Sequence, residues 1–180
     1  MLLDAGIPHT CDPADLDEAK IKTAWSGSPN GLAEKLALEK ALTVSPRHPG
    51  AWVVGSDQVL AFDGQVLDKP GNMDAARAQL LRLRGREHRL ISAVVVVQDD
   101  KAAWSHVDTA VLAMRDFSDA FLDDYLDRAG QDVVASVGAY HLEGLGAQLF
   151  DHIDGDFFTI LGLPLLPLLK AMRAQGAIFS

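Results

Sequence analysis

A two-residue turn between apolar runs constrains the fold more than any other feature of this sequence. Val59–Phe62 and Gln65–Leu67 flank the dipeptide Asp63-Gly64. Asp-Gly favours the positive φ values of a tight hairpin turn, and both flanking runs are rich in residues that form strands. We therefore predict an antiparallel hairpin in which Phe62 pairs with Gln65 and Leu60 pairs with Leu67.

Counting outward from the same turn extends the predicted register beyond the apolar runs. Gln58 is then opposite Lys69, and Asp57 lies beside them at the open end of the hairpin. A carboxylate and an ammonium at this place could hold a metal ion and a phosphate respectively. An exposed ion pair worth about 0.5 kcal/mol explains the same pattern. The spacing by itself leaves both interpretations open.

The rest of the sequence alternates between helical and strand patterns. Helices are predicted where a capping residue precedes an amphipathic run, and strands where apolar and β-branched residues cluster. The predicted helices begin at Ser28-Pro29, at Asn72 or Asp74, at Ser118 and at Pro164; Gly85 and Gly130 end the second and third, and the predicted strands cover 51–54, 88–97 and 107–115. We expect a single α/β domain over residues 1–180.

Charge and cysteine content restrict the class of partner and the compartment. The formal net charge is −9, whereas affinity for a nucleic-acid polymer comes mostly from clustered Lys and Arg. We therefore expect no nucleic-acid partner. The single cysteine, Cys11, cannot form an internal disulfide, which is typical of a reducing compartment. The first residues do not resemble a secretion signal and no apolar run reaches membrane-spanning length, so we expect a cytoplasmic location without a membrane partner.

Four further side chains are candidates for binding, and each also has a structural interpretation. Glu18, in an Asp-Glu pair, could bind a metal or belong to a solvated acidic surface. Lys40 could bind phosphate or complement the end of its helix, and Arg115 could bind phosphate or keep a strand edge soluble. Glu143 precedes glycines that would let a ligand approach the backbone, or it is a turn residue without a partner.

Motifs of several other enzyme classes are absent from the sequence. The six histidines show no metal-ligand spacing, and no GxSxG elbow, P-loop or dinucleotide-binding glycine pattern occurs. Covalent catalysis by a serine nucleophile is therefore disfavoured.

Several segments together resemble the Maf family of nucleoside triphosphate pyrophosphatases across nearly the whole chain. They are Leu36-Ala-Leu-Glu-Lys-Ala41, Val54-Gly-Ser-Asp-Gln-Val59, Asp68-Lys-Pro70, Ala76 to Gly85, Gly138-Ala-Tyr-His-Leu-Glu-Gly144 and Ile160-Leu-Gly-Leu-Pro164. The resemblance implies an α/β fold like that of inosine triphosphatase, with an elongated mixed sheet flanked by helices and a cleft between two lobes. It also implies a homodimer that hydrolyses a nucleoside triphosphate to the monophosphate and pyrophosphate.

The resemblance assigns roles to individual residues. It implies Asp57 as the essential acidic residue, usually described as the proton acceptor, with Glu18, Lys40 and Lys69 around the metal and the phosphates. Glu18 and Asp57 are then the expected ligands of a divalent cation, Mg²⁺ or Mn²⁺. Arg115 is a further candidate for phosphate. A carboxylate can act as a base or as a metal ligand, so both roles of Asp57 stay open.

Two positions carry an expectation about the substrate. Gln58 and Glu143 resemble the branch of the family that acts on 7-methyl-GTP, whereas the dTTP and UTP branch tends to carry Thr and Gln there. A carboxylate accepts well from the two adjacent N–H donors of guanine, and methylation at N7 makes the ring cationic. We expect a preference for 7-methyl-GTP in the removal of modified nucleotides. The alternatives are a broad house-cleaning pyrophosphatase and a weakly active nucleotide-binding protein linked to cell-division control.

The first residues depart from the family pattern. Family members open with a strand and a loop of roughly Ser-x-Ser-Pro-Arg-Arg, and Met1–Ile7 corresponds to the end of the helix that follows. Because those hydroxyls and guanidiniums would bind phosphate, we expect the chain as given to be less active than one extended upstream. A second departure is Asp68, where Gly usually precedes Lys-Pro.

Overall fold

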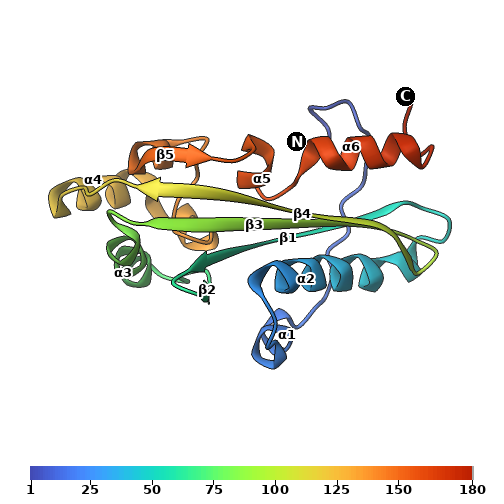
Figure 1. Ribbon diagram of the computed structural model, residues 1–180, viewed down its shortest axis with the longest axis horizontal. Coiled ribbons are helices and arrows are strands. Elements are labelled where there is room, and N and C mark those ends of the chain that lie inside the picture. The colour runs from blue at the N-terminus through green and yellow to red at the C-terminus, as the bar shows by residue number, and fades with distance from the viewer. Residues whose placement is uncertain (180) are drawn as a thin grey trace. The chain divides into compact units, whose positions relative to one another are not determined.

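The chain divides into two compact units, each built from separated stretches of sequence. The computed structural model describes residues 1–179. Unit 1 comprises Met1–Gln58, Ile91–Asp108 and Asp156–Ser180, and unit 2 comprises Val59–Leu90 and Thr109–Gly155. Five strands form a sheet in the order β2-β1-β3-β4-β5 (Figure 1). The expected α/β class is confirmed, whereas the single domain and the cleft between two lobes stay predictions.

Three long strands and two short ones make up the sheet. They are β1 (Val53–Phe62), β2 (Gln65–Leu67), β3 (Glu87–Gln98), β4 (Lys101–Met114) and β5 (Phe150–Asp154). The apolar runs expected as separate strands at 51–54 and 59–62 are joined in one continuous strand, β1, which begins at Val53 rather than at residue 51. Gly55 does not interrupt it because this glycine keeps a strand conformation without a positive φ.

The Asp63-Gly64 hairpin of unit 2 has the predicted register. Leu60 pairs with Leu67, Ala61 with Val66 and Phe62 with Gln65. The two turn residues have φ values of 50° and 74°, as a tight turn of this kind requires. β2 ends at Leu67, shortly before Pro70, which cannot donate a hydrogen bond to a neighbouring strand.

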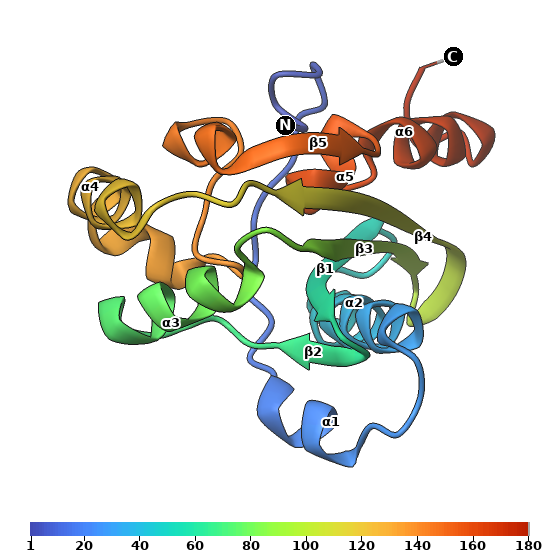
Figure 2. The same cartoon turned by 60° about the vertical axis from the view of Figure 1, so that its left-hand side comes forward.

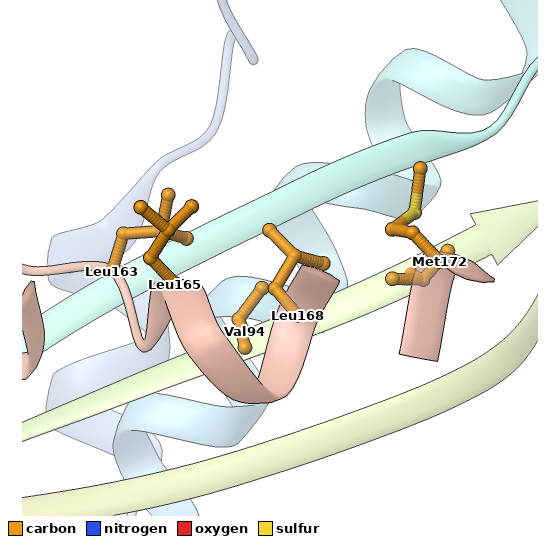
Figure 3. Close-up of a cluster of buried hydrophobic side chains, with 6 residues drawn as sticks. Val94, Leu163, Leu165, Leu168 and Met172 are labelled. Atoms are coloured by element: carbon orange, nitrogen blue, oxygen red, sulfur yellow. The ribbon is translucent and has the colours of Figure 1, made fainter. Parts of the chain in front are cut away.

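In unit 1, helices cover both faces of the strands. α2 (Pro29–Val44) is capped by the side chain of Ser28, and it lies along one face (Figure 1). α6 (Leu165–Ala174) packs on the opposite face, where Leu168 and its neighbours contact Val94 of β3 (Figure 3). The remaining elements of this unit are α1 (Glu18–Ala24), the 3-10 helix η1 (Ser45–Arg47) and α5 (Phe157–Ile160).

In unit 2, two helices and a 3-10 helix pack together. They are α3 (Met73–Leu83), α4 (Asp119–Ala129) and η2 (Gly130–Ala135) (Figure 2). The side chain of Asn72, rather than that of Asp74, caps α3 by accepting from the Ala75 amide at 2.8 Å. Ser118 caps α4 as expected. The 3-10 helix η3 (Leu145–Leu149) leads into β5, which pairs antiparallel with β4.

The interior is largely aliphatic. Within residues 1–179 the buried polar or charged residues are Ser45, His88, Ser92 and Thr159. Each of these must find a hydrogen-bond partner, because an unpaired polar group is unfavourable away from water. No helix in this part of the chain is both long and apolar enough to cross a membrane.

Candidate functional site

Two carboxylates of unit 1 converge on one lysine. Lys40 Nζ, on α2, donates to Oδ1 of Asp57 on β1 at 2.6 Å and lies 2.9 Å from Oε1 of Glu18, at the start of α1. The side chain of Asp57 is 9% exposed, whereas those of Lys40 and Glu18 are 27% and 38% exposed. The resemblance predicts these three residues at one site, and they lie together.

A glycine on β1 makes the contact possible. A Cβ added at Gly55 would lie 2.9 Å from the Cβ of Ala41 and closer still to the carbonyl oxygen of Ala37, so a larger residue does not fit against α2. Asp57 is two residues further along the strand and therefore faces the same way as Gly55. Lys40 follows Ala37 by three residues and lies on the same side of the helix. The close approach of strand and helix thus brings the two charged groups within reach.

Burial and charge act against each other in this group. Burial lowers the pKa of Lys40, but hydrogen bonds and attraction from Asp57 and Glu18 outweigh it and leave that pKa raised. Burial raises the pKa of Asp57, and the hydrogen bond and charge of Lys40 offset this only in part, so the pKa stays above its usual value. The two shifts favour opposite charge states because Asp57 is the more deeply buried partner. Asp57 therefore accepts a proton more readily than an exposed aspartate.

The donor atoms suit a hard divalent cation. Within residues 1–179, no three His, Cys, Asp or Glu side chains form a complete metal cage. Mg²⁺ is commonly held by one or two carboxylates, while substrate phosphates and water supply the other oxygens. Glu18 and Asp57 already share one cationic partner, so they could hold such an ion in place of the ammonium. The requirement for Mg²⁺ or Mn²⁺ stays a prediction.

A cavity of about 550 Å³ in unit 1 borders Lys40. Trp52, Ser56, Asp12 and His48 are among its lining residues. Nε2 of His48 lies 2.7 Å from Oδ2 of Asp12, so polar and aromatic groups border the same space. The volume falls within the range of small-molecule sites.

Gln58 adjoins Asp57 in sequence, but its side chain lies on the other face of β1. Its Nε2 donates to Oγ of Ser92 at 2.9 Å and to the carbonyl oxygens of Thr159 and Ile160 at 3.1 and 2.9 Å. The amide nitrogen is therefore used within unit 1. A role for Gln58 in substrate choice stays a prediction.

Lys69 belongs to unit 2, where it is exposed and follows the end of β2. Strand pairing stops at Leu67, so the register of the hairpin does not extend to Lys69. Asp68 and Lys69 therefore lie beyond the paired strand that the prediction assumed. A contact between Lys69 and Asp57 stays a prediction, and the register of the hairpin does not support it.

Arg115 and Glu143 also belong to unit 2. Nε of Arg115 donates to the carbonyl oxygen of Gln148 at 2.7 Å, and its guanidinium lies 4.6 Å from the ring centroid of Phe121. Arg115 thus has a structural use beside η3 and α4. Glu143 is exposed in a turn, which leaves its carboxylate accessible. Their roles toward phosphate and base stay predictions.

The family model described as "Maf-like protein" matches residues 1–175. The chain belongs to the Maf family. This Maf chain is 54% identical to a nucleoside triphosphate pyrophosphatase of Paramagnetospirillum magneticum, over 99% of this chain and 93% of that protein. It is 48% identical to a nucleoside triphosphate pyrophosphatase of Rhodospirillum rubrum, over 100% of this chain and 91% of the relative. A 7-methyl-GTP pyrophosphatase of Brucella abortus is 44% identical, over 99% of this chain and 91% of its own length.

Sequence reasoning missed the polar residues behind β1 of this Maf chain. Ser92 and Thr159 are both 0% exposed. Ser92 interrupts an otherwise apolar run on β3, and a polar residue at such a position needs an internal partner. Gly55 was an available clue as well, because glycine inside a strand often marks a close approach of another backbone. Neither pattern identifies which residues the serine or the glycine contacts, because those contacts depend on the fold.

Proposed function

We propose that this Maf protein is a nucleoside triphosphate pyrophosphatase that hydrolyses its substrate to a nucleoside monophosphate and pyrophosphate. The observation that carries the proposal is the contact of Lys40 with both Asp57 and Glu18. The name of the Paramagnetospirillum magneticum relative, 54% identical, supports the same activity. The neighbouring cavity of about 550 Å³ adds room for a small molecule beside Lys40.

The chemistry of the reaction fits these side chains. Water adds its oxygen to the α-phosphorus, the bond from that phosphorus to the oxygen leading to the β-phosphorus breaks, and pyrophosphate leaves with the electron pair. Asp57, with its raised pKa, suits acceptance of the proton that the water gives up. Lys40, with Lys69 and Arg115 as further candidates, suits the negative charge that builds on pyrophosphate. A divalent cation held by Glu18 and Asp57 would supply charge neutralisation at the phosphates.

We further propose a preference for 7-methyl-GTP, in the removal of modified nucleotides. Glu143 supports this preference, because its exposed carboxylate is free of the protein interior and suits the two N–H donors of guanine. A cationic, methylated ring would add attraction to the same carboxylate. The name of the Brucella abortus relative agrees with this substrate.

Release of pyrophosphate from 7-methyl-GTP, GTP, dTTP and UTP, with Mg²⁺ or Mn²⁺ and with chelator, tests both levels of the proposal. We expect turnover that needs the cation and is fastest with 7-methyl-GTP. Asp57→Asn should lower kcat/KM by about 10³-fold, whereas the exposed Asp127→Asn, a matched removal of one carboxylate charge, should leave it unchanged. A pyrimidine preference would contradict the substrate assignment alone. Nucleotide binding without pyrophosphate release would contradict the enzyme and favour the regulatory alternative.

A further inference from the structure

Four consecutive residues of β1, 55–58, face alternate sides of the sheet. Positions 55 and 57 face α2, and the helix is so close that no side chain fits at position 55. Ser56 and Gln58 face the other way, because side chains alternate along a strand. On β3, Val94 also faces this second side and packs toward α6 (Figure 3). The side chains of Ser56 and Gln58, both half-buried, therefore lie on the face of β1 opposite to the Lys40 contact.

The amide of Gln58 is fixed by its surroundings. Its nitrogen has two hydrogens, and within reach are the hydroxyl of Ser92 and the carbonyl oxygens of Thr159 and Ile160. Two of these groups accept only, so the nitrogen rather than the oxygen of the amide must face them. The side chain thus joins β1 to the α5 segment with a defined orientation.

Other hydrogen bonds extend this connection on the same face. Oγ of Ser56 donates toward the carbonyl oxygens of Gly162 at 2.7 Å and Ala93 at 2.9 Å. Oγ of Ser92 donates to the carbonyl oxygen of Thr159 at 2.7 Å. Since Ser92 and Thr159 are both 0% exposed, water cannot replace the lost partners if the network is cut.

The hydroxyl of Thr159 continues the chain by donating to Oδ2 of Asp108 at 2.8 Å. The amide of the same residue donates to Oδ1 of Asp156, the cap of α5, at 3.0 Å. The segment that receives Gln58 is therefore held in turn by two carboxylates. This segment, fixed by its own hydrogen bonds, in turn binds β1 through Gln58.

We propose that Gln58 and Ser56 are positioning residues for Asp57, and that Gln58 influences the reaction through β1 rather than by touching the nucleotide. On one face, Gly55 fixes how closely β1 approaches α2; on the other, Ser56 and Gln58 fix the strand against the segment 159–162. Asp57 lies between these two attachments. Its carboxylate stays 2.6 Å from Lys40 because the strand cannot move toward either side.

The kinetic test of this proposal rests on the proposed pyrophosphatase activity. A small displacement of a catalytic group can lower the reaction rate strongly. Gln58→Met keeps the length of the side chain and removes its hydrogen bonds; Ser56→Ala removes the other attachment. We expect kcat to fall by roughly 10-fold or more in each variant while KM changes by less than about 2-fold, because a displacement of the order of 1 Å can slow a reaction 10²-fold. Ser56→Thr, which keeps the hydroxyl, should restore most of the rate lost in Ser56→Ala.

A matched control comes from the same unit. Oγ of Ser45 accepts from the amide of Asp100 at 3.0 Å, and Ser45 is 2% exposed. Ser45→Ala therefore removes a buried hydroxyl of the same kind at a place distant in sequence from Asp57. It should lower thermal stability to a similar degree as Ser56→Ala while leaving kcat unchanged.

A second measurement does not depend on activity. The rate at which a small acylating reagent modifies Lys40, measured by mass spectrometry relative to the exposed Lys101, reports how firmly Asp57 holds the ammonium. We expect this ratio to rise about 3-fold or more in Gln58→Met and Ser56→Ala, because an amine that has left its 2.6 Å contact with Asp57 is more accessible to the reagent. If the wild-type chain hydrolyses no nucleotide, the pyrophosphatase proposal fails while this ratio still decides the positioning role. An unchanged ratio, with KM raised for one nucleotide only and kcat preserved, would instead show that Gln58 contacts the base and would overturn the inference.

Discussion

The Lys40 group of unit 1 and the His88–Tyr140 pair of unit 2 are built in opposite ways. Unit 1 gathers ionised side chains, with Lys40 between Asp57 and Glu18, and leaves them 9% to 38% exposed. Unit 2 encloses a neutral pair, in which Nε2 of His88 lies 2.6 Å from the hydroxyl of Tyr140 and the two residues are 1% and 3% exposed. Burial lowers the pKa of His88 to about 4 and raises the pKa of Tyr140 well above its usual value, so both stay uncharged near neutral pH.

This difference separates two uses of a buried polar group. Charges that remain partly accessible can exchange partners with a ligand, whereas a sealed neutral pair can only hold its surroundings together. Changes to the Lys40 group of unit 1 should therefore appear mainly in the reaction rate. Changes in unit 2 should appear mainly in the free energy of unfolding.

The largest effect is expected from Lys40→Met. Removing this ammonium should lower kcat/KM by about 10² to 10³-fold, because a cation placed at developing phosphate charge is lost. The free energy of unfolding should fall by less than about 2 kcal/mol, since Glu18 is 38% exposed and Asp57, whose pKa burial raises, can take up a proton in place of its lost partner. Pyrophosphate release and urea denaturation measure the two quantities, and the exposed Lys101→Met is the control. A large loss of stability with full activity would erase the distinction between the units.

The second effect is a loss of stability in acid that originates in unit 2. The pKa of His88 falls from 6.5 to about 4 on folding, so between these values the unfolded chain binds more protons than the folded one. Stability is therefore lost as the pH falls from 6.5 toward 4, by about 3 kcal/mol in total. Urea denaturation of the wild type and of His88→Phe at a series of pH values isolates this part. Equal pH dependence in both proteins would show that His88 is not sealed.

A smaller effect is expected from Gly55→Ala, which tests how the unit 1 group is assembled. The added Cβ meets Ala37 and Ala41 of α2, so the free energy of unfolding should fall by about 2 kcal/mol. The rate should fall as well, because α2 and β1 must separate to admit the methyl group. Gly144→Ala, where the nearest atom is 3.9 Å away, is the control for stability. A variant as stable as the wild type would mean that this close approach does not set the Lys40–Asp57 contact.

The smallest effect is expected from Arg86→Lys in unit 2. The guanidinium of Arg86 lies 4.4 Å from the ring centroid of Phe62, and its Nη2 is 2.7 Å from Oδ1 of Asp63. Lysine keeps the charge but not the planar stacking, so the free energy of unfolding should fall by about 0.5 kcal/mol. Activity should not change. Arg89→Lys, at an exposed arginine within β3, serves as the comparison.

Local chemistry made part of this fold predictable from the sequence. The register from Leu60–Leu67 to Phe62–Gln65 follows from a two-residue turn and from the alternation of side chains along a strand. The caps at Ser28 and Ser118 follow from side chains that bond amides three residues away. Such features depend on neighbours in the chain, and the sequence contains those neighbours.

The site was less predictable because its contacts join distant residues. Glu18 and Lys40 meet only because α1 packs against α2, and Lys40 meets Asp57 only because Gly55 admits the helix. Counting from the hairpin turn could not reveal that the side chain of Gln58 bonds residues 159–162, since these residues are distant in sequence. The resemblance to the Maf family, rather than spacing, supplied the grouping of Glu18, Lys40 and Asp57.

The position of Lys40 has a consequence for how ligands arrive. Two carboxylates and one ammonium leave the trio with a single net negative charge, so the acids tolerate one another before any ion is present. If a divalent cation binds Glu18 and Asp57 as proposed, it takes the place of the ammonium, and a displaced ammonium is best satisfied by an anion. Cation and polyphosphate should therefore strengthen each other's binding by the same factor, as thermodynamic linkage requires. In a cell rich in free Mg²⁺, such reciprocity would keep the acids occupied by lysine until a nucleotide is at hand.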